Sequence, residues 1–232
     1  MKKEFDLQFM KENMMGPNAV TLLYETIEGL TLLPGMRVMD LGCGTGLTSM
    51  CLAESGATVF AVDLWITATE NDRRFKQVSP GRDIIPIHAD ATDLPFADEF
   101  FDAVVSVDSY HYFGRDAKYM DEKLAPLVKK GGVIAICVPG LKHELNGELP
   151  EEIKKSWSAK DMETMHSCEW WHGLLSESKL VDVLEVRETR SFETCWEDWL
   201  QCDNPYAIGD RAAMRAGAGK YLNFVLMICR RK

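Results

Sequence analysis

The stretch VMDLGCGTGLTSM, residues 38–50, carries three glycines within five positions, between a short apolar run and a segment of helical character. A glycine-rich turn that joins a buried strand to a helix lets a ligand approach the main chain, because no side chains stand in its way. Dinucleotide-binding proteins use such a turn with the spacing G-x-G-x-x-G. Here the spacing is G-x-G-x-G, and Leu47 occupies the place of the third glycine of that pattern.

An acidic residue, Asp40, lies at the end of the strand that leads into this turn. A carboxylate at that place repels a diphosphate and attracts a ligand that carries an ammonium group. Asp40 and the altered spacing therefore argue against an NAD-dependent oxidoreductase, which is the first alternative function.

Short runs of Val, Ile, Phe and Ala recur along the chain without alternation, as in central parallel strands that are covered on both faces. They predict strands at 37–41, 57–62, 84–88, 101–107 and 133–138. Helical segments, including 47–55 and 117–128, lie between them. The repeated strand–helix order predicts an α/β fold with a doubly wound, mostly parallel, seven-stranded sheet.

Segments at the two ends complete a single predicted domain over 1–232. Residues 1–35 are expected to form a helical lid, broken at MMGPN, where Asn18 or Thr21 can cap the second helix. Residues 140–175 look like an insertion on the substrate side, with helical stretches around 150–156 and 158–166. Beyond it we predict helices at 169–180 and 195–202 and strands at 181–189 and 221–231.

The motif VMDLGCGTG resembles the first motif of class I S-adenosylmethionine-dependent methyltransferases. The segments FAVDL, IHADATDLPFADEFFDAVVS and LVKKGGVIAI resemble later motifs of this family and follow in its order, so that the resemblance covers roughly residues 35–140. DATDLPFADEFFD looks most like the small-molecule branch, which includes ubiquinone-biosynthesis and cyclopropane-synthase-like enzymes. The resemblance implies a Rossmann-like methyltransferase fold with S-adenosyl-L-methionine as cofactor.

The resemblance also implies a set of cofactor-binding residues. Asp63 ends the second strand, where an acid can accept two hydrogen bonds from ribose hydroxyls; Asp90 would contact the adenine amino group, and the N–H of Ala91 would face a ring nitrogen. The full predicted set is Asp40, Gly42, Cys43, Gly44, Thr45, Gly46, Asp63, Leu64, Asp90, Ala91 and Asp108. Taken singly, the glycines could form only a tight turn, Asp63 could cap a helix, and Asp90 could be an ordinary loop carboxylate. Cys43 is expected to offer only its backbone N–H.

The segment VVSVDSYHYFG follows the fourth strand, at the edge of the sheet where ligands bind in doubly wound folds. A base is needed only when the attacking atom of the acceptor carries a proton. We predict His111 as that base, with Tyr110 or Tyr112 orienting it or the acceptor. The alternative is that His111 caps the next helix while the tyrosines pack against it. Asp108 is expected at the methionine end of the cofactor.

Tryptophans are the other aromatic signal. Trp65 follows Asp63 closely and is expected either against the adenine or in the core, and the other five lie in the later half, where the acceptor pocket is expected. The group His166, Cys168 and His172 lacks a fourth ligand and a familiar spacing, so we expect no metal site.

Composition limits the partners. A net charge of −10 argues against nucleic acid, no apolar run reaches membrane-spanning length, and the first ten residues lack the apolar core of a secretion signal. Seven scattered cysteines suit reduced thiols in the cytoplasm. We expect a small-molecule acceptor, with an amine or an aromatic compound slightly favoured; oxygen, sulfur and carbon acceptors stay open. A binding module that has lost catalysis is the second alternative function.

Overall fold

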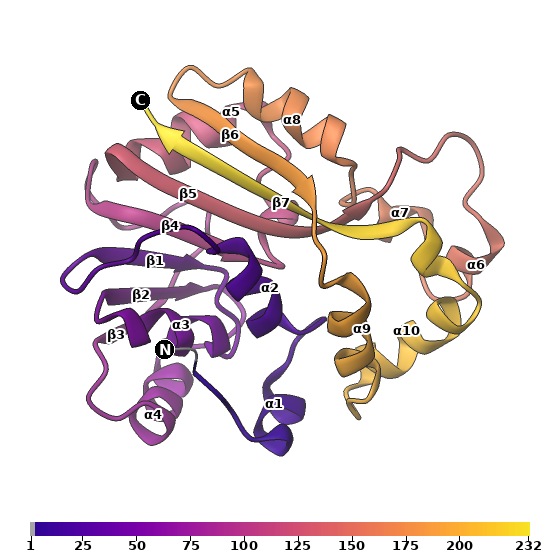
Figure 1. The fold of residues 1–232 in the computed structure, drawn as a ribbon, viewed down its shortest axis with the longest axis horizontal. Helices are drawn as coiled ribbons and strands as arrows, with labels where there is room; N and C mark the ends of the chain where they lie inside the picture. Colours follow the sequence, from indigo (N-terminus) through magenta and orange to yellow (C-terminus); the bar gives the residue numbers. More distant parts are fainter. Residues whose placement is uncertain (1–2) are drawn as a thin grey trace.

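The computed structural model of the protein describes residues 3–232. Seven strands form one sheet in the order β3-β2-β1-β4-β5-β7-β6 (Figure 1). Their bounds are β1 Arg37–Leu41, β2 Thr58–Asp63, β3 Ile84–His88, β4 Phe101–Val107, β5 Val128–Leu141, β6 Val181–Glu188 and β7 Leu222–Arg231. β7 runs antiparallel to both of its neighbours, and the other pairs are parallel. The predicted fold class, a doubly wound and mostly parallel seven-stranded sheet, is confirmed.

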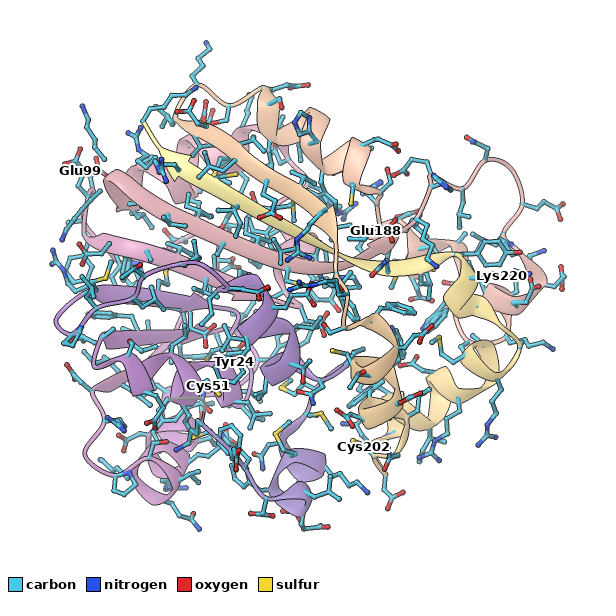
Figure 2. The ribbon with its side chains drawn as sticks, in the orientation of Figure 1. Tyr24, Cys51, Glu99, Glu188, Cys202 and Lys220 are labelled. Atoms are coloured by element: carbon cyan, nitrogen blue, oxygen red, sulfur yellow. The ribbon has the colours of Figure 1, made fainter. Side chains whose placement is uncertain are left out.

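Helices cover both faces of the sheet, because its central strands are apolar on both sides. One face packs on α2 (Ala19–Thr26), α3 (Leu47–Leu52), α4 (Ala68–Val78) and α9 (Phe192–Leu200). The other face packs on α5 (Ala117–Tyr119), the turns that follow it, and α8 (Cys168–Ser176). Figure 2 shows Tyr24 of α2 beside Cys51 of α3, a contact through which the N-terminal segment rests on the first crossover helix.

The connection between β4 and β5 differs from the prediction of one helix at 117–128. After α5 the chain forms a π-helix, Met120–Leu124, and a 3-10 helix, Ala125–Leu127. β5 then begins at Val128, earlier than predicted, because Val128 pairs with Phe101 before the register shifts. Shorter 3-10 turns occupy Ala53–Ser55, Tyr110–Tyr112 and Ala218–Lys220.

The segment after β5 leaves the sheet. It carries α6 (Glu151–Lys154) and α7 (Ala159–Met162), and it packs with α10 (Pro205–Arg215) in a separate apolar cluster. Figure 1 shows α6, α7, α9 and α10 together at one end of the molecule, on the right. Helix α10 was not predicted, although Asn204 caps it and Pro205 is its first residue, which is an ordinary start signal.

The N-terminal segment forms α1 (Leu7–Asn13) and α2, with the predicted break between them. Asn18 caps α2 through its side-chain oxygen, which accepts from the N–H groups of Val20 and Thr21. Its amide nitrogen donates to Asp198 of α9 over 2.7 Å. The break therefore fixes the N-terminal segment to the C-terminal part of the chain.

Candidate functional site

A cavity of about 200 Å³ lies where β1, β2 and β4 end. The strand order reverses between β1 and β4, and this switch point is where ligands bind in doubly wound folds. Nine of the eleven residues predicted to bind a cofactor line the cavity: Gly42, Cys43, Gly44, Thr45, Asp63, Leu64, Asp90, Ala91 and Asp108. The fold thus brings together residues from four separate turns, those after β1, β2, β3 and β4.

The glycine turn meets close neighbours on its inner side. Gly42 has φ +76°, and a Cβ added there would lie 2.2 Å from Oγ of Ser109. The N–H groups of Gly42 and Cys43 both donate to the carbonyl of Val62, over 2.8 and 3.0 Å. The Cys43 N–H is therefore engaged within the protein rather than offered to a ligand, which differs from the expectation.

Asp63 organises the turns on both sides of it. One carboxylate oxygen accepts from the N–H of Gly44 over 2.8 Å, and the other accepts from Trp65 and Ile66 over 2.7 and 2.8 Å. Asp63 does not cap α4, because Thr67 does so with a capping box. Its carboxylate lines the cavity and has further lone pairs for a ligand.

Asp90 borders the same cavity beyond β3. Its Oδ1 accepts from the N–H and hydroxyl of Thr92, both over 2.7 Å, and these bonds hold the pKa of Asp90 below its usual value. Ala91 follows it, and its carbonyl accepts from the hydroxyl of Tyr119 over 3.0 Å. Hydrogen bonds thus fix both Asp63 and Asp90, which border the cavity where the neighbouring strands β2 and β3 end.

Two residues of the predicted set lie outside the cavity lining. Asp40 is 1% exposed, and its Oδ2 accepts from the hydroxyls of Thr48 and Ser49, each over 2.6 Å. Burial raises the pKa of Asp40 to about 6. Gly46 begins α3 with φ +81°, and a Cβ there would meet the ring of Phe75 at 2.2 Å. Glycine at this position serves helix packing.

The break between α1 and α2 covers the cavity. Asn13, Met14, Met15 and Gly16 line it, and the carbonyl of Asn13 accepts from the Thr45 hydroxyl over 2.6 Å. The predicted lid therefore contacts the glycine turn directly.

Some side chains of the turn after β4 are buried away from the cavity, whereas others line it. Tyr110 is fully buried among Phe113, Tyr119 and Trp171, and its hydroxyl has no hydrogen-bond partner among residues 3–232. His111 is 3% exposed, and burial lowers its pKa to about 3. Neither side chain lines the cavity, so the predicted catalytic roles of Tyr110 and His111 gain no support from this geometry.

Asp108 and Tyr112 of the same turn do line the cavity. Asp108 has φ +58°, a left-handed conformation that is uncommon for a residue other than glycine and is often found at functional sites. Its N–H donates to the carbonyl of Cys137 on β5 over 2.8 Å. Burial, together with the charge of Asp210, raises the pKa of Asp108 to about 7.

One cluster beside this site was not predicted from the sequence. Asp210 of α10 accepts from the indole N–H groups of Trp157 and Trp199, each over 2.9 Å. These two tryptophans lie in the part of the chain where an acceptor pocket was expected, but they hold a carboxylate instead. The available sequence signal was Asn204-Pro205, which marks the start of a helix and thereby places Asp210 within it.

The cavity chemistry fits a cationic ligand. Within residues 3–232, the ionisable side chains that line it are acidic or neutral, with no Lys, Arg or His among them. A diphosphate would find no cation there, whereas a sulfonium with an amino group would meet three carboxylates. The described residues bring together no group of three His, Cys, Asp or Glu that could hold a metal ion, and none of their helices is long and apolar enough to cross a membrane.

Comparison with known proteins agrees with this chemistry. Residues 39–136 match the family model for a methyltransferase domain. The demethylmenaquinone methyltransferase of Clavibacter sepedonicus is 40% identical over 112 residues, 48% of this chain and 44% of that protein. That of Mycobacterium sp. (strain KMS) is 36% identical over 114 residues, 49% of this chain and 46% of that protein. The chain spans less than half the length of these curated relatives.

Solved structures resemble most of the chain in fold. Phosphoethanolamine N-methyltransferase 2 of Haemonchus contortus, in complex with S-adenosyl-L-methionine, superposes with a TM-score of 0.74 at 20% identity, over 94% of this chain and 54% of that one. YjhP from E. coli superposes with a TM-score of 0.67 at 20% identity, over 97% and 99%. At these identities the likeness concerns the fold. Residues 39–136 are thus similar in sequence to a methyltransferase domain and to part of the demethylmenaquinone methyltransferases.

Proposed function

We propose that the protein transfers a methyl group from S-adenosyl-L-methionine to a small-molecule acceptor. The observation that carries this proposal is the acid-lined cavity at the ends of β1, β2 and β4, closed on one side by the lid. When bound, the donor supplies an electrophilic methyl group and leaves as a neutral thioether. The protein's main contribution is then to hold donor and acceptor in line and away from water.

Different residues of the cavity would bind different parts of the donor. Asp63 and Leu64 would bind the ribose, and Asp90 with Ala91 would bind the adenine, because these residues line the cavity where the neighbouring strands β2 and β3 end. Gly42 and Thr45 would flank the methionine part, close to the buried carboxylate of Asp40. Trp65 also lines the cavity, and at 66% exposure it is not part of the core.

The remaining features support a soluble small molecule as acceptor. An acidic cavity without a cation suits neither a phosphate-rich nucleic acid nor an anionic lipid surface. All seven cysteines are unpaired, which supports a reducing compartment, and we propose the cytoplasm.

Calorimetry with purified protein tests this function. Titration with S-adenosylmethionine and with S-adenosylhomocysteine should give saturable binding, whereas NADH should give none. If only NADH binds, the protein is an oxidoreductase. Incubation of a cell extract with methyl-labelled donor should then label a small molecule; donor binding without labelling of any compound would favour the non-catalytic module.

A pair of variants tests the donor site itself. Asp90→Ala should weaken S-adenosylhomocysteine binding about tenfold or more, as expected for loss of a hydrogen bond to a charged group. Asp93→Ala serves as the matched control, because Asp93 is an exposed acid three residues away and does not line the cavity. Equal affinities of the two variants would contradict the placement of the adenine.

A further inference from the structure

Asp108 differs from the other carboxylates of the cavity in having no partner for its side chain. Asp63 accepts from three backbone N–H groups, and Asp90 accepts from Thr92. Among residues 3–232 no hydrogen bond or ion pair satisfies the carboxylate of Asp108, although it is half-buried. A carboxylate held away from water without a partner is costly, so its place at the cavity points to a ligand.

The backbone fixes the direction of this carboxylate. The left-handed conformation of Asp108 and its N–H bond to Cys137 set its main chain at the end of β4. On the other side lies the lid, where a Cβ at Gly16 would be 2.1 Å from Oδ2 of Asp108. The carboxylate therefore lies between the end of the sheet and the lid, and β1 separates its strand, β4, from the two strands that lead to Asp63 and Asp90.

Aromatic rings border the cavity near Asp108. Tyr112 and Trp65 both line it, their ring centroids are 5.6 Å apart, and they are 54% and 66% exposed. Burial and then the charge of Asp108 raise the pKa of Tyr112 to about 12, so the phenol stays neutral and close to that carboxylate. A carboxylate beside aromatic faces is a combination that binds ammonium groups.

We propose that Asp108 binds the ammonium nitrogen of a cationic amine acceptor and receives its proton, with Tyr112 and Trp65 against the alkyl part of that acceptor. This inference rests on the proposed methyl transfer and names its substrate class. Asp108 then takes the part for which His111 was predicted.

Methyl transfer to the amine involves one proton and two electron pairs. One N–H proton of the ammonium moves to the carboxylate of Asp108, which frees the nitrogen lone pair. That pair forms the new nitrogen–carbon bond with the methyl group, and the electron pair of the broken carbon–sulfur bond stays on sulfur. The methylated product carries the positive charge, and Asp108 returns its proton to water after the product leaves.

The ionisable groups around Asp108 allow it to take up and release a proton near neutral pH. Asp210 of α10 raises its pKa by repulsion, Tyr112 stays neutral, and Cys137 of β5 is a buried thiol whose pKa is raised by burial. With a pKa of about 7, Asp108 can both accept and release a proton under ordinary conditions.

The binding test uses choline and its neutral carbon isostere, 3,3-dimethylbutan-1-ol, as probes in the presence of S-adenosylhomocysteine. Wild-type protein should bind choline at least about tenfold more tightly than the isostere, because only choline is charged. Asp108→Asn should abolish this preference. Asparagine tolerates the left-handed conformation, so the variant is expected to keep its fold, which its melting temperature will show. The control is Asp203→Asn, an exposed acid before α10 that lies outside the cavity lining and should leave the preference intact.

A second measurement separates an acceptor role from a donor role. Asp108→Asn should keep its affinity for S-adenosylhomocysteine while turnover with a panel of primary amines falls about a hundredfold or more, and the limb of kcat/KM near pH 7 should disappear. A loss of S-adenosylhomocysteine affinity equal to the loss of turnover would place Asp108 on the donor's amino group and overturn the proposal. Equal binding of choline and the isostere by wild-type protein would overturn it too. If wild-type protein binds no S-adenosylhomocysteine, the proposed function itself fails, and this outcome is separate from the other two.

Discussion

Replacing Glu25 by Gln should destabilise the protein strongly at neutral pH and less in acid. Glu25 of α2 is buried, and its carboxylate accepts from Arg187, from the backbone N–H of Arg190, and from the N–H and hydroxyl of Ser191. Burial alone would raise the pKa of Glu25, but these bonds outweigh it and lower the pKa from 4.5 to about 2. The carboxylate thus joins the lid helix to the segment between β6 and α9.

The size and sign of the effect follow from this shift. Because the pKa is lower in the folded protein, the ionised carboxylate contributes its full stability above pH 4.5, and the contribution disappears as the pH falls through about 2. A shift of this size corresponds to about 3 kcal/mol at pH 7 and about 2 kcal/mol at pH 3.5. Urea unfolding of wild type and Glu25→Gln at both pH values gives the loss in free energy of unfolding at each pH, and the two losses are then compared.

Glu28→Gln is the matched control. Glu28 lies in the turn just after the same helix and also pairs with Arg190, but its side chain is 61% exposed, so its loss should cost at most about 1 kcal/mol. Two results would contradict the assigned role of Glu25: a loss of stability in Glu25→Gln no larger than in this control at pH 7, or the same difference between the two variants at both pH values.

Three further predictions concern variants in the site and around it. Gly42→Ala should abolish S-adenosylhomocysteine binding in calorimetry, because a Cβ there overlaps a serine side chain on the adjoining turn, whereas Gly44→Ala meets only the flexible Met15 and should cost about 1–2 kcal/mol for its left-handed backbone. Trp199→Phe should lower the free energy of unfolding by about 1–3 kcal/mol, since it removes a hydrogen bond to a partly buried carboxylate. Trp196→Phe should cost less, because its indole N–H has no partner among the described residues; a larger loss would contradict this. Thr45→Val should speed dissociation of S-adenosylhomocysteine about fivefold in stopped-flow measurements through loss of the hydrogen bond to the lid, and an unchanged rate would exclude that role.

The donor side of the site was predictable because its signals are local. A glycine turn, an acid that ends the next strand and an acid after the third strand each occupy a fixed place relative to a strand that the sequence itself marks. Parallel pairing then brings these strand ends to one edge without further information. Gly42, Asp63 and Asp90 accordingly line one cavity.

The turn after β4 was harder, because its outcome depends on packing. Three consecutive polar aromatic residues, Tyr110, His111 and Tyr112, offer no pattern that tells inside from outside. The 3-10 turn sends the first two inward, where other aromatic rings fill the core, and leaves the third exposed. The left-handed backbone of Asp108, which sets this turn, is also invisible in the sequence.

The turn after β1, which we assign to the methyl donor, is hydrogen-bonded to the turn after β4, which we assign to the acceptor. Gly42 therefore matters for both binding sites. The carbonyl of Leu41 accepts from the hydroxyls of Ser106 and Ser109, over 2.9 and 2.8 Å. Ser109 fits there only because Gly42 has no Cβ, and Ser109 is the residue that directly follows Asp108. A side chain at position 42 would therefore displace Ser109 and with it the carboxylate that we assign to the amine. Loss of donor binding and loss of the choline preference should accordingly appear together in Gly42→Ala, although Asp108→Asn separates them.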